Sequence, residues 1–116
     1  MDYSREILDS LDDPVFFGDR EYRLRFSNNS FCEHFNFQSD SITGKSLSRL
    51  FDGDLFESQM KDSIDRCLQG QRIHDVLILE RTKDQPGYRM DIHYNPHYDS
   101  RKKIDGFIAL LDNAQK

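Results

Sequence analysis

The stretch DDPVFFGDREYRLRFSNNSF, Asp12–Phe31, decides the fold. Two short apolar runs flank the charged turn Gly18–Glu21, and this pattern predicts a β-hairpin. In the second run, Tyr22–Ser27, the two-residue period of a strand puts Leu24 and Phe26 on one face. Nothing in the stretch has the character of a catalytic group.

A helix is expected directly after this hairpin. Asn28 or Asn29 can cap its N-terminus, because a short side-chain oxygen accepts a hydrogen bond from the first free backbone N–H groups. Asn36 is expected to end the helix in the left-handed conformation, for which Asn is the second choice after Gly. Shorter helical turns, punctuated by Gly44, are expected over 39–50.

The clearest helix is predicted over Asp54–Gln69, with Gly70 ending it. Its apolar residues recur at helical spacing and form one stripe, as in a helix that packs on a core. The residues of the stripe are Phe56, Met60, Ile64, Cys67 and Leu68.

Three strands are expected after that helix. The first, 72–82, is apolar on both faces at Val76–Leu79, as a covered central strand would be. The second, 88–95, alternates strictly, and its inward-facing residues are expected to be Tyr88, Met90, Ile92 and Tyr94. A loop over 96–105 and a last strand over 106–112 complete the chain.

The expected order is therefore a helix, two strands, several helices and three strands. It predicts an α+β fold with one five-stranded antiparallel sheet and helices packed on one face. We divide the chain into an N-terminal amphipathic helix, 1–12, and a main domain, 13–113.

The first helix carries an apolar stripe that must be covered. We expect it to fold onto the outer face of the sheet, where Phe107 and Leu111 are expected to point, or to pack on a partner. Symmetric dimers are the commonest assembly, so a homodimer is favoured. The candidate dimer residues are Tyr3, Ile7, Leu8 and Leu11.

Length and composition fit one globular domain. The chain has 116 residues, of which 36% are hydrophobic and 32% charged. Its formal net charge of −5 disfavours nucleic acid as a partner, because such binding needs a basic face. No apolar run is long enough to span a bilayer and no signal peptide is recognisable, so we expect a cytoplasmic protein with Cys32 and Cys67 reduced.

The order and spacing of several short motifs resemble those of the PAS domain, the sensory-box module of signalling proteins. The hairpin carries Asp13-Pro14 before its first strand, Asp19 at its turn, and Asn28 three residues before Phe31. Two glycines of the family pattern are missing. The hairpin turn continues after Asp19 as Arg20-Glu21-Tyr22-Arg23, without the usual Gly, and Asn36 stands where the next motif of the family begins with Gly. The matching motifs downstream are Gly44-Lys45, Leu68-x-Gly70, Pro96, Asp105-Gly106 and Asp112-Asn113-Ala114, the last without the usual Thr.

The resemblance implies a sensory and dimerisation module of a signalling protein, with an output domain such as a histidine kinase or a diguanylate cyclase. Signal would leave through the last strand at Asp112. A small apolar or aromatic ligand would lie between sheet and helices. The candidate pocket residues are Phe26, Phe31, Phe35, Phe56, Met60, Ile64, Met90 and Ile92.

No cofactor is predicted. Photoactive flavin PAS domains form an adduct with a Cys, but the segment after Gly44 reads Lys45–Phe51 without one. Haem PAS domains of the oxygen-sensing kind use an axial His near the position of Gln59, and the long helix contains no His. The histidines His34, His74, His93 and His97 are interpreted as solvated surface residues, so no metal site is predicted.

An enzymatic role is not expected for this domain. Asp12-Asp13 is interpreted as a helix terminator and Asp54 as a helix cap, rather than as catalytic carboxylates. Two alternatives stay open beside the ligand sensor. One is a PAS platform for protein interactions with no ligand, and the other is a small pocket enzyme of the ketosteroid-isomerase-like type.

Overall fold

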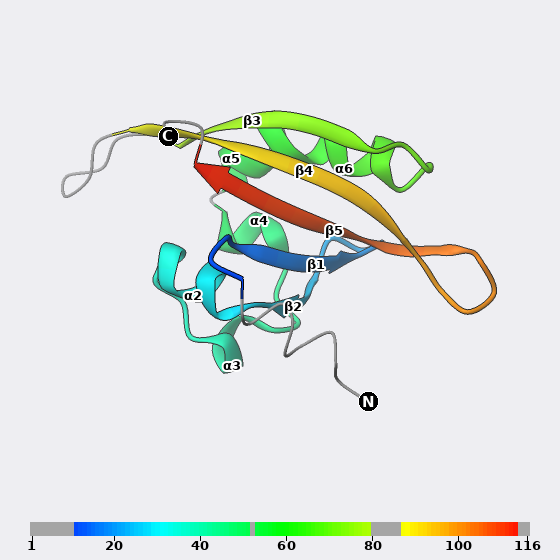
Figure 1. The fold of residues 1–116 in the computed structure, drawn as a ribbon, viewed down its shortest axis with the longest axis horizontal. Helices are drawn as coiled ribbons and strands as arrows, with labels where there is room; N and C mark the ends of the chain where they lie inside the picture. The colour runs from blue at the N-terminus through cyan, green and yellow to red at the C-terminus, as the bar shows by residue number, and fades with distance from the viewer. Residues whose placement is uncertain (1–10, 52, 80–86, 114–116) are drawn as a thin grey trace.

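The computed structural model of the protein describes residues 11–51, 53–79 and 87–113. They form one five-stranded antiparallel sheet with the helices packed on one face, as predicted (Figure 1). The helix predicted at 1–12 lies outside the described residues, except for its last two positions. The strands are β1 (Val15–Asp19), β2 (Leu24–Ser27), β3 (Ile73–Leu79), β4 (Tyr88–Tyr98) and β5 (Ile104–Asn113).

The strand order across the sheet is β2-β1-β5-β4-β3. The last strand of the chain therefore lies at the centre, where Val15 pairs with Leu110 on one side and His93 pairs with Leu110 on the other. The predicted hairpin is confirmed, since β1 pairs with β2 and Phe17 lies opposite Phe26.

The prediction that the apolar run Val76–Leu79 lies in a central strand was wrong. β3 is an edge strand, and the side chain of Ile78 is 56% exposed. Leu77 is fully buried, because it faces the helices, whereas Val76 and Ile78 belong to the other face of the sheet. A short apolar run indicates a strand but does not specify its place in the sheet.

β4 is longer than predicted and continues through Pro96 to Tyr98. The ladder with β3 ends at the pair Ile73–Tyr94. Beyond that pair no strand of the described residues lies on that side of β4, so a proline without an N–H group is tolerated there. The loop predicted over 96–105 is correspondingly shorter.

The helices are α2 (Asn29–Phe35), α3 (Ser39–Ile42), α4 (Leu47–Leu50), α5 (Gly53–Leu55), the π-helix η1 (Phe56–Met60) and α6 (Lys61–Cys67). Both predicted caps of α2 are confirmed. The Asn28 side chain accepts from the Phe31 N–H at 2.9 Å, and Asn36 is left-handed with φ 60°. α5, η1 and α6 together form the predicted long helix, whose π-helical segment the apolar stripe did not indicate.

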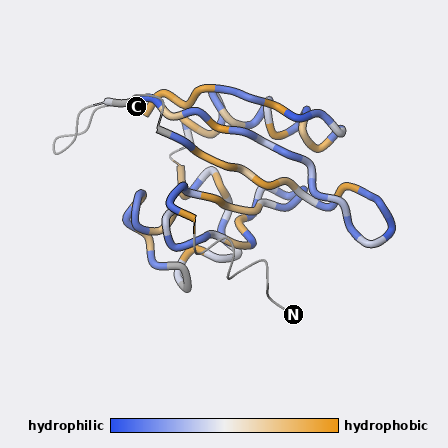
Figure 2. Tube along the Cα trace, viewed as in Figure 1, coloured by the Kyte–Doolittle hydropathy of each residue, from blue (hydrophilic) through white to orange (hydrophobic). Residues whose placement is uncertain are grey.

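The core lies between the sheet and the helices. Hydrophobic and hydrophilic residues alternate along the first half of β4 (Figure 2), as expected when one face is buried. Phe107 and Leu111 are buried in this core, so the prediction that they point to the outer face was wrong. Both faces of β5 are apolar, because Ile108 and Leu110 occupy the other side, and alternation alone could not choose between them.

Among the described residues, no helix is long and apolar enough to cross a membrane.

Candidate functional site

The predicted pocket residues come together in one buried cluster, with one exception. Six of them are buried in the core, and Phe35 is partly buried against it. They come from α2, from the helix η1–α6 and from β4, so the sheet and the helices both contribute walls. The six buried residues are Phe31, Phe56, Met60, Ile64, Met90 and Ile92.

The exception is Phe26. In the hairpin Phe17 lies opposite Phe26 and Gly18 lies opposite Leu24, so Arg25 is an extra residue in a β-bulge. The bulge places Leu24 and Phe26 on opposite faces of the sheet. Leu24 is buried in the core, whereas Phe26 shares the outer face with Phe17.

Three phenylalanines that the pocket prediction left out complete the interior. The ring of Phe31 lies 5.3 Å from Phe16 and 5.9 Å from Phe51, centroid to centroid. Phe16 in turn meets the edge of Phe107 at 6.0 Å. Offset and edge-to-face contacts of this kind add to the stabilisation from burial. A count of aromatic residues predicts such a cluster, but only the strand register shows which rings join it.

Tyr94 brings a hydroxyl group into this interior. It lies on β4 beside Phe107, with ring centroids 6.0 Å apart, and none of its side chain is exposed to solvent. Within the described part of the chain, its hydroxyl is the buried side-chain N or O atom without a hydrogen-bond partner. Burial, with the nearby charge of Asp75 and the Cys67 thiol adding to it, raises the pKa of Tyr94, so the hydroxyl stays protonated and can donate.

The hydroxyl of Tyr94 has polar neighbours that are already occupied. Ser63 on α6 donates to Asp75 Oδ2 at 3.0 Å, and the Val76 N–H donates to Asp75 Oδ1 at 2.8 Å. Both oxygens of the Asp75 carboxylate thus accept hydrogen bonds from the chain. Cys67 is also buried, and burial raises the pKa of its thiol from 9.0 to about 11.

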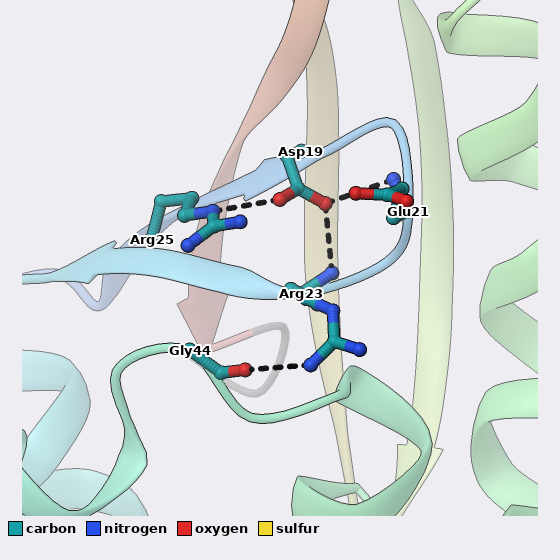
Figure 3. Close-up of polar contacts among 5 residues, drawn as sticks. All are labelled: Asp19, Glu21, Arg23, Arg25 and Gly44. Carbon is teal, nitrogen blue, oxygen red and sulfur yellow. Dashed lines mark hydrogen bonds and ion pairs between the residues drawn. The ribbon is translucent and has the colours of Figure 1, made fainter.

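Asp19 organises the turn of the hairpin (Figure 3). Its Oδ1 accepts from the backbone N–H of Glu21 at 2.8 Å and of Arg23 at 3.0 Å, and its Oδ2 accepts from Arg25 Nε at 2.6 Å. Burial alone would raise the pKa of Asp19, but the hydrogen bonds from Arg23, Arg25 and Glu21 outweigh it and lower the pKa from 3.8. Asp19 is therefore a structural carboxylate.

Tyr22 takes the backbone position where a glycine would be expected in this turn. Its φ is 62°, in the left-handed region of backbone conformation that residues other than Gly, Asn and Asp seldom adopt. The side chain compensates with contacts to the long helix, since its hydroxyl donates to Asp65 and its ring meets the edge of Phe56 at 5.5 Å. Tyr22 thus ties the hairpin to α6.

The outer face of the sheet carries three of the four histidines. His74 and His93 stack with centroids 4.3 Å apart, and His74 Nε2 lies 3.1 Å from Asp91 Oδ1. His97 Nδ1 lies 2.6 Å from Asp105 Oδ1. In the part of the chain that the structure describes, no three metal-ligating side chains gather at one point. An open hollow of about 380 Å³ adjoins the stack, lined by Arg72, Ile73, His74, His93, Asn95 and Leu110.

The remaining predicted positions lie away from the interior. Gln59, near the position of a haem ligand, directs its amide to the backbone of β3. Asp112 is exposed near the end of β5, opposite Asp91. Leu11 is 39% exposed, and Tyr3, Ile7 and Leu8 lie outside the described residues.

Residues 8–113 match the family described as the PAS fold. The chain belongs to the PAS family. No curated protein is similar enough to match it. PAS domains are typically sensory modules of signalling proteins and are generally not enzymes.

Solved PAS structures share the fold. The PAS domain of BvgS from Bordetella pertussis has a TM-score of 0.77 at 18% identity, covering 98% of this chain and 85% of that chain. A PAS domain from Colwellia psychrerythraea has a TM-score of 0.76 at 13% identity, covering 93% of this chain and 91% of that chain. The VqmA–ligand–DNA complex of Vibrio cholera has a TM-score of 0.79 at 14% identity, covering 93% and 49%. At such identities the likeness establishes the fold alone.

Two similar structures bear on the expected partners. One is described as an RNA-binding Light-Oxygen-Voltage receptor, and the VqmA structure contains DNA. For this PAS domain, the expected lack of a nucleic-acid partner, of flavin and of haem therefore stays a prediction. The division into a helix at 1–12 and a domain at 13–113 also stays a prediction.

Proposed function

We propose that this PAS domain is a cytoplasmic ligand-sensing and dimerisation module of a signalling protein of the histidine kinase or diguanylate cyclase type. Its ligand is a small apolar or aromatic molecule held between the sheet and the helices. One observation carries this proposal: the Tyr94 hydroxyl is buried in the core, and the described residues offer it no hydrogen-bond partner.

A buried hydroxyl without a partner is costly, because its hydrogen bonds to water are lost and not replaced. A ligand that offers one acceptor to Tyr94 would remove that cost. Apart from the Asp75 carboxylate and the Cys67 thiol, the surroundings described here are apolar, with Phe107 beside the tyrosine ring and Met90 and Ile92 on the same strand. The class of ligand that fits is therefore an apolar body with a single carbonyl, ether or similar acceptor.

The path for output follows the strands. Tyr94 on β4 lies opposite Ala109 on β5, and β5 leads to Asp112. A ligand can act along this path only if it binds one packing of the strands better than another. PAS domains commonly dimerise, and a homodimer through Tyr3, Ile7, Leu8 and the exposed Leu11 belongs to the proposal.

The test begins with freshly purified protein that is denatured, with the released small molecules identified by mass spectrometry. We expect one compound in stoichiometric amount. Its affinity for refolded Tyr94→Phe should fall about tenfold, the effect of one hydrogen bond. Tyr98→Phe is the matched control, because Tyr98 lies on the same strand and is 51% exposed, and it should bind as the wild type does.

The alternative is a PAS platform for protein interactions without a ligand. It is favoured by the close packing of the interior, where the Phe31 ring contacts both Phe16 and Phe35, the latter at 4.9 Å. In that case the wild type would release nothing, and the Tyr94 hydroxyl would be satisfied by a buried water. Those two results together would reject the ligand proposal.

A further inference from the structure

The two edges of the sheet are closed in different ways. At the β2 edge the neighbouring loop supplies backbone partners: the Leu24 N–H donates to the Lys45 carbonyl at 2.9 Å, and the Gly44 N–H donates to the Leu24 carbonyl at 2.7 Å. The other edge is β3, whose strand partner among the described residues is β4. An edge strand presents backbone N–H and C=O groups that can pair with another chain.

The side chain of Gln59 occupies this β3 edge. The Ile78 N–H donates to Gln59 Oε1 at 2.7 Å, and Gln59 Nε2 donates to the Ile78 carbonyl at 3.0 Å. These two bonds reproduce the pair that a residue of a neighbouring antiparallel strand would make. The amide of Gln59 thus takes the place of one residue of a sixth strand.

A second side chain closes the next outward-facing position of β3. The Val76 N–H donates to Asp75 Oδ1, and Ser63 holds the other oxygen of that carboxylate. Beside this edge the Ile78 side chain is 56% exposed. The edge therefore carries an exposed apolar residue, and among the described residues the side chains of Gln59 and Asp75 cover it at these two positions.

Gln59 reaches the edge from the π-helix η1. Its neighbours Phe56 and Met60 are buried in the core, whereas the Gln59 amide is directed to β3. π-helical turns are rare and are often found at functional positions. In η1 the wider π-helical turn lets Phe56 and Met60 pack in the core while the Gln59 amide reaches the backbone of β3.

We propose that Gln59 closes the β3 edge, and that its release, with the Asp75 carboxylate giving up the Val76 N–H to the second copy, allows β3 to pair with β3 of a second copy of this chain. The segment is self-complementary: in an antiparallel pair centred on Val76, Ile78 faces His74 of the second copy and Asp75 faces Leu77. No like charges then lie opposite each other, and the exposed Ile78 gains cover. The closure of this edge by Gln59 is independent of any ligand in the interior.

The main test is Gln59→Ala, with Glu57→Ala as the matched control because Glu57 is an exposed residue of the same π-helix. Amide exchange is measured by NMR and mass by light scattering over a concentration series. In dilute Gln59→Ala the Ile78 amide should exchange about tenfold faster than in the wild type. At high concentration its mass should exceed the wild-type mass and the amide should become protected again, whereas Glu57→Ala should match the wild type throughout.

Two further variants make the result decisive. Adding Ile78→Lys to Gln59→Ala should restore the wild-type mass, because a lysine on an edge strand opposes pairing. Gln59→Glu keeps an acceptor for the Ile78 N–H but loses the donor to the Ile78 carbonyl. Its association should therefore lie between that of the wild type and that of Gln59→Ala. If Gln59→Ala does not fold, Gln59→Glu is compared with the wild type in its place. An unchanged exchange rate at Ile78 would reject the closure of the edge by Gln59. Faster exchange with the wild-type mass at every concentration would reject pairing of β3.

Discussion

At the scale of single residues, two tyrosines are unfavourable in different ways, one in its backbone conformation and the other in its side-chain hydroxyl. Tyr22 has an unfavourable backbone conformation and well-paired side-chain atoms, whereas Tyr94 has an ordinary strand backbone and an unpaired hydroxyl. Positive φ at a residue such as Tyr persists only where surrounding contacts determine it. Removing the two hydroxyls should therefore change stability in opposite directions.

Tyr22→Phe should lower the free energy of unfolding by about 1–2 kcal/mol, because it removes the hydrogen bond to the Asp65 carboxylate and keeps the positive φ. Urea titration followed by circular dichroism measures this change. In a double-mutant cycle with Asp65→Ala, most of the loss should disappear when Asp65 is already absent. Equal losses in both backgrounds would show that the hydroxyl does not act through Asp65.

Tyr94→Phe should raise the free energy of unfolding of the ligand-free protein by about 1 kcal/mol, because it removes an unsatisfied buried hydroxyl and keeps the ring. Thermal and urea unfolding check this expectation. Tyr98→Phe should change neither measurement, since that hydroxyl is exposed. A loss of stability in Tyr94→Phe would mean that the hydroxyl has a partner, such as a bound water.

At the scale of elements, local patterns predicted the hairpin and the caps, and missed what depends on pairing. Asn28 and Asn36 were identified because capping acts within a few residues. Phe26 was assigned to the wrong face, because the extra residue Arg25 becomes visible only when β1 is laid beside β2. Similarly, nothing in the periodicity of the long helix distinguishes the π-helical turn that directs Gln59.

The hairpin turn should give the domain an acid-dependent stability. Because the pKa of Asp19 is lowered in the folded state, its contribution is present above pH 3.8 and is lost as pH falls through the lowered pKa. Asp19→Asn keeps an acceptor for the backbone but loses the charge facing Arg25. It should cost about 1 kcal/mol at pH 7 and almost nothing near pH 2, as measured by urea unfolding at both pH values. A cost that does not change with pH would contradict this account.

At the scale of the whole molecule, the family and the order of the elements could be predicted, whereas strand order could not. The family motifs are short and lie in a fixed order along the chain, so the sequence alone reveals them. The central position of β5 and the edge position of β3 in the sheet depend instead on contacts between segments that are distant in sequence. The outer-face assignment of Phe107 failed for the same reason. The unpartnered hydroxyl of Tyr94 also depends on the complete interior, so sequence could place the tyrosine inward and go no further.

The buried interior should make the fold sensitive to alkali. The pKa of Cys67 is raised to about 11, so stability from this group is fully present below its ordinary value of 9.0 and is lost as pH rises towards 11. Over that window the free energy of unfolding should fall by up to about 1.4 kcal/mol per pH unit. Urea unfolding from pH 8 to 11 measures the slope. Cys67→Ala should show a shallower slope, and an identical slope would exclude the thiol as its source.

The central position of β5 also governs the order of events during synthesis. The hairpin of β1 and β2 is synthesised before the helices α2 to α6, but β5, the strand that must lie beside β1, is synthesised only after those helices, β3 and β4. Until then Phe16 has no Phe107 to pack on, and its apolar surface is available to chaperones or to other nascent chains. Pairings between such distant segments close slowly. We therefore expect ribosome-bound chains that stop before Ile104 to be cut readily by protease, and chains in which β5 has emerged to resist it.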